Sequence, residues 1–280
     1  MIRMSVPLKP TLFADTASIV NTERGEAIAF FRKRENKDKT FTFKAYKEKP
    51  IVQALNEHFA NKCAYCESSY AATAPVDIEH YRPKSEIVED KKRIRPGYYW
   101  LACDWGNLLP ACRDCNSPRN HRFANGIVKL RGKANWFPIA NPKQRAKKPG
   151  QENREQRLLL HPYRDDPTKH LEYTEDGVIR PKPDKSGRSS RKGRTSIRVY
   201  GLDRPLLTDA RRKQAVQTQG AIEKIRGLME LLDESETSTS RAKAEKLLAT
   251  EIADLKKKFL ETEVYSAMHQ HLANEFLASL

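Results

Sequence analysis

Four cysteines in this sequence are spaced as the ligands of a metal ion. They form two C-x-x-C pairs, Cys63/Cys66 and Cys112/Cys115, and two such pairs are the usual source of a tetrahedral four-thiolate zinc site. Bound there, zinc would join two segments whose nearest cysteines are 46 positions apart and stabilise the fold by closing that loop. Four thiolates leave no open coordination position, so the sequence predicts a structural Zn²⁺ and not a catalytic one.

Side chains suited to hydrolysis lie between the two pairs and directly after them. They are Glu79 and His80, then Asn107, and finally Asn116, which follows the last cysteine. In this setting they resemble the HNH endonucleases, whose ββα-metal core places a His at the end of the first strand, an Asn before the second strand and a His or Asn on the helix. The resemblance implies that His80 is the general base and that Glu79 and Asn116 are ligands of a catalytic Mg²⁺ or Mn²⁺. It implies that Asn107 holds the conformation of the loop.

This set of side chains fits phosphodiester hydrolysis, in which a water must lose a proton and attack in line. Neutral His, with an ordinary pKa of about 6.5, can take that proton at cellular pH. A hard cation bound by oxygens would offset the charge that develops on the phosphate. Glu79 stands where many HNH sites carry Asp, a difference of one methylene that bears on ligand geometry and metal preference.

Longer strings narrow the resemblance further. Between about residue 50 and about residue 213 the chain is similar to the PtuB-type HNH proteins of Septu and retron-associated antiphage systems. The resemblance implies a nuclease subunit that works with a PtuA-type ATPase and that has retron RNA or DNA as a further candidate partner. The strings that carry it are CAYCE (63–67), IEHYRPK (78–84), YYWLACDWGNLL (98–109) and LLLHPYRDDP (158–167).

Charge points to a polyanionic partner. The 280 residues carry a formal net charge of +16, and Lys and Arg contacts to phosphates supply most sequence-independent affinity for nucleic acid. Basic proteins also bind membranes or are simply soluble, so charge alone leaves these alternatives open. Seven basic residues near the motifs and in the basic stretch 177–213 are the candidate nucleic-acid contacts: Arg82, Lys84, Arg119, Arg122, Arg191, Lys192 and Arg194.

Cysteine usage and hydropathy bear on localisation. Four of the five cysteines have metal spacing, and the chain shows no signal peptide and no apolar run long enough for a bilayer. We expect a cytoplasmic protein with no membrane partner. The fifth, Cys103, lies among aromatic residues and is expected to be a buried thiol.

Periodicity predicts an α+β fold: a ββα-metal HNH core stapled by the four-cysteine zinc site, with flanking helices and a C-terminal helical region. Helices are expected over 23–34, over 46–61, from within 112–123 and, as three amphipathic segments, beyond 208. Strands are expected over 75–81 and 158–163, with a hairpin over 172–179 and loops over 82–95 and 181–193. The expected division is an N-terminal arm with a short helix (1–45), the nuclease core (46–135), a basic connecting region with short strands (136–207) and the helical region (208–280).

Some alternatives remain open from sequence alone. Period-two alternation puts Glu79 and His80 on opposite faces of an ideal strand, so a site that uses both needs a twist or bulge. Asn116 is also a suitable helix N-cap. The leading interpretation is a metal-dependent HNH endonuclease that cuts DNA; an RNA-cleaving HNH nuclease and a non-catalytic zinc-ribbon nucleic-acid-binding module are the alternatives.

Overall fold

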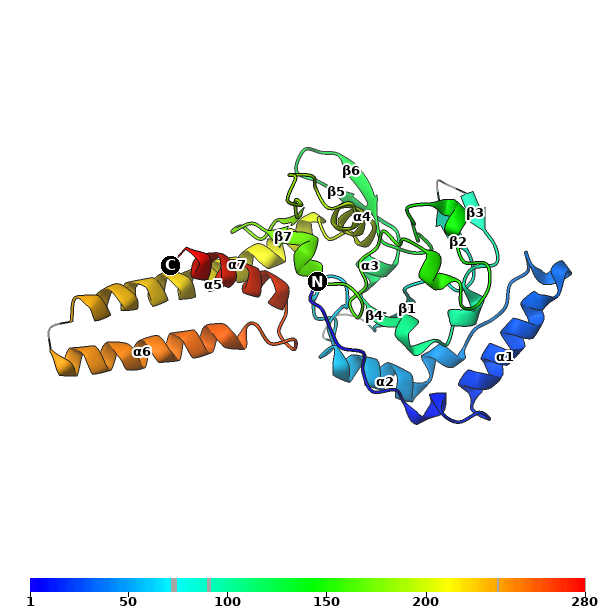
Figure 1. Ribbon diagram of the computed structural model, residues 1–280, viewed down its shortest axis with the longest axis horizontal. Coiled ribbons are helices and arrows are strands. Elements are labelled where there is room, and N and C mark those ends of the chain that lie inside the picture. Colours follow the sequence, from blue (N-terminus) through cyan, green and yellow to red (C-terminus); the bar gives the residue numbers. More distant parts are fainter. Residues whose placement is uncertain (72–74, 90–91, 236, 280) are drawn as a thin grey trace.

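The computed structural model describes residues 1–71, 75–89, 92–235 and 237–279. In these residues the chain forms helices and four small antiparallel sheets, which confirms the predicted α+β class. Most elements gather in one body, and a pair of long helices projects from it (Figure 1). No helix in the described part of the chain has both the length and the hydrophobicity needed to cross a membrane.

Two helices precede the first cysteine pair. Helix α1 (Ile19–Arg32) begins four residues before the predicted start, because the Ser18 side chain caps it by accepting a hydrogen bond from the Asn21 N–H. Helix α2 (Lys49–His58) buries Ile51 and Leu55 on one side. These helices form one side of the body, as Figure 1 shows.

The central sheet has only two strands. Strand β1 (Asp77–His80) pairs antiparallel with β4 (Leu108–Ala111), so that His80 lies opposite Leu108. A short helix, α3 (Arg113–Asn116), follows β4 at once. The order strand, strand, helix is therefore present around the predicted site residues.

Three further hairpins surround this unit. They are β2 (Ile87–Glu89) with β3 (Lys92–Ile94), β5 (Arg119–Arg122) with β6 (Val128–Arg131), and β7 (Leu171–Tyr173) with β8 (Ile179–Pro181). The last of these matches the hairpin predicted over 172–179.

Three predicted elements are wrong. Residues 82–95 contain the β2–β3 hairpin and are not a loop. The helix after Cys112 ends at Asn116, because Pro118 follows and the chain turns into β5. Residues 158–163 contain no strand, although 159–163 are buried; only Arg157, just before them, makes an isolated bridge, to Ile139.

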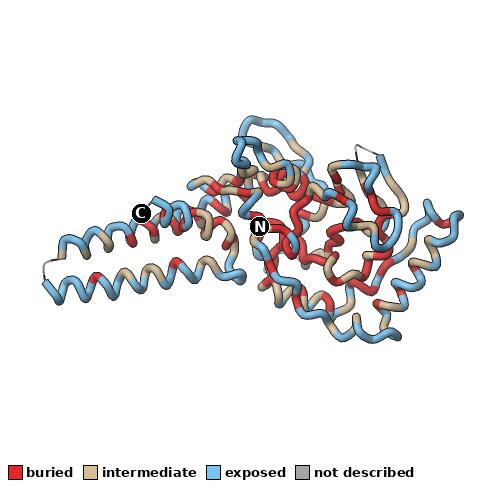
Figure 2. Tube along the Cα trace, in the orientation of Figure 1, coloured by how far each residue is buried: buried red, intermediate tan, exposed pale blue. Residues whose placement is uncertain are grey.

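Four helices complete the chain: α4 (Arg191–Tyr200), α5 (Pro205–Asp233), α6 (Ser238–Lys257) and α7 (Ser266–Ala278). Helix α5 packs against both α6 and α7. The α5–α6 hairpin extends away from the body (Figure 1), and Figure 2 shows that most of its surface is exposed. A small apolar cluster joins the three helices through residues such as Ile225, Leu255 and Phe276.

The main hydrophobic core draws on nearly the whole chain. It includes Met1, Tyr65 beside the first cysteine pair, Tyr200 of α4 and Leu272 of α7. Tyr65 and Tyr200 stack with their ring centroids 3.9 Å apart. The cysteine pairs are thus set within the main core and not at its edge.

Candidate metal centre and nuclease site

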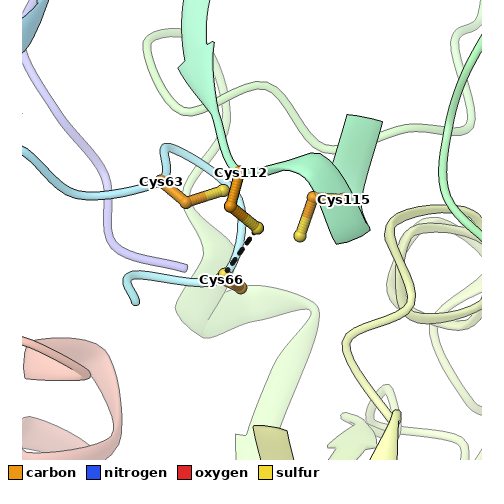
Figure 3. A group of neighbouring side chains, drawn as sticks. All are labelled: Cys63, Cys66, Cys112 and Cys115. Carbon is orange, nitrogen blue, oxygen red and sulfur yellow. Dashed lines mark hydrogen bonds between the residues drawn. The ribbon is translucent and has the colours of Figure 1, made fainter. Parts of the chain in front are cut away.

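The four predicted zinc ligands converge. The sulfur atoms of Cys63, Cys66, Cys112 and Cys115 all lie within 4.8 Å of one another, and among the described residues no other group of three or more Cys, His, Asp or Glu does so. Figure 3 shows the four side chains pointing at a common centre, with the Cys66 and Cys112 sulfurs 3.7 Å apart. Four soft sulfur donors in this arrangement fit a tetrahedral zinc ion.

Tight backbone turns orient the sulfur atoms of the two cysteine pairs. The Glu67 N–H donates to the Cys63 carbonyl, and Glu67 has a positive φ of 64°. In the second pair, the N–H groups of Cys115 and Asn116 both donate to the Cys112 carbonyl. Each turn therefore places two sulfurs on the same side of its backbone.

A buried arginine contacts the sulfur cluster. One Arg204 nitrogen lies 3.4 Å from the Cys115 Sγ, and another lies 3.5 Å from the Cys66 Sγ and 3.7 Å from the Cys112 Sγ. Burial raises the pKa of the Cys63 and Cys115 thiols. A coordinated cation offsets that cost because it deprotonates its thiol ligands, and Arg204 adds a positive charge beside them. The residues present therefore suit a four-thiolate zinc site.

His80 lies at the end of β1 and is 4% exposed. Its Nε2 is 2.8 Å from the Ala102 carbonyl oxygen, and its Nδ1 is 3.3 Å from the Lys84 ammonium. The Tyr46 ring packs edge-on against the imidazole at 4.5 Å. Three separate segments thus hold the ring in place.

These contacts define the protonation state of the imidazole. A carbonyl oxygen only accepts hydrogen bonds, so Nε2 carries the proton, and in a neutral ring Nδ1 is then unprotonated and accepts from the Lys84 ammonium. Burial and the neighbouring Lys84 ammonium hold the pKa of His80 well below its usual value. His80 is therefore neutral near pH 7, with Nδ1 as the basic atom.

Glu79, the residue before His80, is also buried and has its own partner. Its carboxylate accepts a hydrogen bond from the ammonium of Lys133, whose side chain is fully buried and also donates to the His80 carbonyl at 2.9 Å. Burial raises the pKa of Glu79, and Lys133 opposes that rise. The two adjacent side chains thus have different hydrogen-bond partners, Lys133 for Glu79 and Ala102 with Lys84 for His80.

The turn after β6 brings Lys133 to this place. The Lys133 N–H donates to the Cys115 carbonyl, and the Ala134 N–H donates to the Asn116 carbonyl. Gly132 makes this docking feasible because it has a φ of +110° and a Cβ there would lie 2.0 Å from the Ser117 carbonyl oxygen. Sequence analysis missed Lys133, since no periodic pattern marks it.

The two asparagines differ in their partners. The Asn107 Oδ1 accepts from the Arg82 N–H at 2.7 Å, and its Nδ2 donates to the carbonyls of Arg82 and Leu101. Asn116 ends α3, which excludes the N-cap role, and its Nδ2 donates to the Asp77 carboxylate at 3.0 Å. Asp77 was also missed, although it alternates with Glu79 on β1.

The seven predicted basic contacts lie in different surroundings. Arg82 is buried and paired with Glu155, Arg119 pairs with Asp114, Lys192 pairs with Asp165, and Lys84 faces His80. Arg122 is exposed on β5 and not on a helix. Arg191, Lys192 and Arg194 lie in the first turn of α4, so the first two do not belong to the loop predicted over 181–193.

Comparisons with known proteins find similarity to Septu proteins. No protein-family model matches the chain. It is 44% identical over 181 residues to Septu protein PtuB of Bacillus mycoides (strain KBAB4), covering 64% of this chain and 55% of that protein. It is also 29% identical over 164 residues to Septu protein PtuA of the same strain, covering 58% of this chain and 20% of that protein.

A third relative is Septu protein PtuB of Bacillus thuringiensis, 34% identical over 73 residues, which are 25% of this chain and 24% of that protein. The chain thus spans about half the length of the first relative and about a quarter or less of the other two. Over 64% of its length the chain is a relative of Septu protein PtuB, and the PtuB-type resemblance predicted from its motifs is confirmed.

Proposed function

We propose that the protein is a metal-dependent HNH endonuclease of an antiphage Septu system, which hydrolyses phosphodiester bonds of nucleic acid, DNA in preference to RNA. It acts in the cytoplasm with a PtuA-type ATPase, and in a retron-associated setting retron RNA or DNA would be a further partner. Similarity to PtuB and PtuA supports the defence role and the ATPase partner.

One observation carries the chemical part of the proposal. The β1–β4 pair leads directly into α3, and His80 ends the first strand with Nδ1 unprotonated while Ala102 holds Nε2. In this arrangement Nδ1 would take a proton from the attacking water. Asn107 would keep the residues after His80 in place through its three hydrogen bonds to Arg82 and Leu101.

Glu79 and Asn116 are the residues proposed to hold the catalytic Mg²⁺ or Mn²⁺. Both lie near the Lys133 turn: Glu79 through its carboxylate and Asn116 through its carbonyl. A divalent cation there would offset the negative charge that develops on the phosphate. Asp77, already hydrogen-bonded to Asn116, is a third oxygen donor on the same side of β1.

The direct test is cleavage of plasmid DNA and of total RNA by the purified protein with Mg²⁺ or Mn²⁺, with and without the PtuA-type ATPase. We expect His80→Ala to abolish cutting. His58→Ala is the matched control, because His58 is a half-buried histidine on α2 that contacts Ser5 and Tyr163, outside this site. Undiminished cutting by His80→Ala would show that the proposed mechanism is wrong, and the nucleic acid that is cut decides between DNA and RNA.

A non-catalytic zinc-ribbon binding module is the second candidate. It is favoured by the near-complete burial of His80 and by the Lys84 ammonium that already faces Nδ1. A protein that binds zinc and nucleic acid but cuts neither substrate under any of these conditions, ATPase included, would support this module over the nuclease.

A further inference from the structure

A cavity of about 540 Å³ lies beside the residues that follow β1. Five cationic side chains contribute to its lining: Arg82, Arg157, Arg164, Arg191 and Lys192. Four of these, all except Arg82, lie beyond residue 150, well after the predicted nuclease residues in sequence. The fold therefore concentrates positive charge at one concave place.

Nearby carboxylates compensate only part of this charge. Arg82 pairs with Glu155 at 2.9 Å, while Arg157 and Lys192 share the single carboxylate of Asp165. Among the described residues, neither Arg164 nor Arg191 has a carboxylate within 4.0 Å.

The lining carboxylates are themselves engaged. Glu155 accepts from Arg82, from the Tyr98 hydroxyl at 2.6 Å and from the Ala146 N–H at 2.9 Å, and Glu152 accepts from the Trp100 indole. They hold the wall of the cavity together, and neither of them pairs with Arg164, which Asp104 attracts from beyond ion-pair distance.

Arg164 is held among like charges. Burial and the positive charges of Arg82 and Arg157 lower the pKa of its guanidinium. Arg82 and Arg157 cannot move away, because their side chains are only 5% and 16% exposed and both lie over the Tyr81 ring. A bound anion would relieve this repulsion, and phosphate oxygens suit the donor geometry of several arginines.

The cavity adjoins the candidate nuclease site. Arg82 is two residues beyond His80, a span of at most about 7 Å, and the Asn107 side chain grips its backbone. Arg164 lies against the neighbouring Gly106, where a Cβ would be 3.6 Å from its Nη2. His161, three residues before Arg164, also contacts the Gly106 carbonyl oxygen at 3.1 Å.

We infer that this cavity binds backbone phosphate of a nucleic-acid strand. Arg164 and Arg191 are the principal hydrogen-bond donors, and Arg82 and Arg157 supply immobile positive charge in the cavity wall. The nucleic-acid identity of the ligand rests on the proposed function. The site would anchor the strand beside His80 without taking part in the bond cleavage.

The test is binding of a fluorescent duplex DNA and a single-stranded RNA at several salt concentrations without added Mg²⁺ or Mn²⁺. The variants are Arg164→Glu and Arg191→Glu. Arg198→Glu is the matched control: it is exposed on α4 two turns after Arg191 and does not line the cavity. Thermal melting of each variant checks that it is folded.

We expect each cavity variant to bind at least one of the two probes on the order of 10-fold more weakly at low salt. For that probe, the slope of log K against log salt should fall by about 1. If Arg198→Glu loses as much nucleic-acid affinity as the cavity variants, only net charge matters and the proposed site is wrong. Unchanged affinity in Arg164→Glu would also contradict the site. Free AMP and inorganic phosphate are titrated in parallel. If the cavity variants lose only these small ligands and keep nucleic-acid affinity, the inference is wrong.

Because binding is measured without cleavage, its outcome is separate from that of His80→Ala. If the His80→Ala protein still cuts nucleic acid, the proposed mechanism is wrong, but the proposal of a phosphate site is unaffected. Loss of the phosphate site would leave the general-base assignment untouched.

Discussion

The buried ammonium of Lys133 donates a hydrogen bond to the carboxylate of Glu79, the residue proposed to hold the catalytic cation. The two side chains are 0% and 9% exposed. A divalent cation at Glu79 would therefore lie beside a fixed positive charge, and the two cations would compete for one carboxylate.

Removing the ammonium should destabilise the protein strongly. Breaking a buried ion pair leaves an uncompensated charge and costs about 3–5 kcal/mol, so Lys133→Met should lower the urea midpoint. The double variant Lys133→Met/Glu79→Gln should recover much of that loss. Millimolar Mn²⁺ should stabilise Lys133→Met more than the wild type if Glu79 binds the metal; equal effects on both proteins would argue against Glu79 as a ligand.

Lys84 should set the pH range in which the proposed base works. Its positive charge lowers the pKa of His80, so Lys84→Met should raise that pKa and move the acid limb of the kcat–pH profile to higher pH. Lys49→Met, at the exposed start of α2, is the control. A profile that does not move would mean that Lys84 does not act on the base.

Arg204 should strengthen zinc retention. Residues that donate hydrogen bonds to metal ligands typically change metal affinity 10–100-fold, and Arg204 reaches three of the four sulfurs. We expect Arg204→Met to lose zinc to a coloured chelator much faster than the wild type, and Cys112→Ser to fail to hold zinc at all. Arg212→Met, exposed on α5, the helix that begins directly after Arg204, should release zinc at the wild-type rate. Wild-type release from Arg204→Met would contradict this role.

His269 should make the helical region acid-sensitive. It is buried against the Thr218 hydroxyl, 2.6 Å from its Nδ1, and burial together with Lys258 lowers its pKa to about 4. In the unfolded chain the pKa is about 6.5, so below that pH the unfolded state binds the proton first. The free energy of unfolding should therefore fall as the pH drops from about 6.5 to about 4.

His269→Gln removes this titration and should flatten the fall, measured by urea titration across that pH range. Zinc ligands also respond to acid, so the comparison is between variant and wild type at each pH. His58→Gln, on a half-buried histidine of α2 outside the helical region, is the control and should follow the wild-type curve. A His269→Gln curve parallel to the wild type would exclude His269 as a source of acid sensitivity.

The features that sequence predicted well are those encoded in local spacing. Each C-x-x-C pair needs only a short turn to place its two sulfurs on one side. The convergence of the two pairs follows from the tetrahedral geometry of a four-thiolate zinc site. The Ile51 and Leu55 stripe likewise predicts α2, although the structured helix ends at His58. Cys103 is buried, as its aromatic neighbours predict.

What sequence missed depends on contacts between distant segments. Lys133 reaches Glu79 only because Gly132 lets its turn dock on α3, and Arg204 reaches the sulfurs from far along the chain. The short helix α3 was expected to be longer because neither the effect of Pro118 nor the pairing of β5 with β6 shows as periodicity. Long-range packing overrode local pattern at each of these places.

The position of Arg204 also sets an order of events during synthesis. It lies 89 residues after Cys115 and directly precedes α5. At ribosomal speeds of about 5–20 residues per second, the four cysteines would be made roughly 4–18 s before the arginine that contacts them. A nascent chain in that interval would have all the metal ligands but not their neighbouring positive charge, so metal capture and docking of the C-terminal helices should be separate steps of maturation.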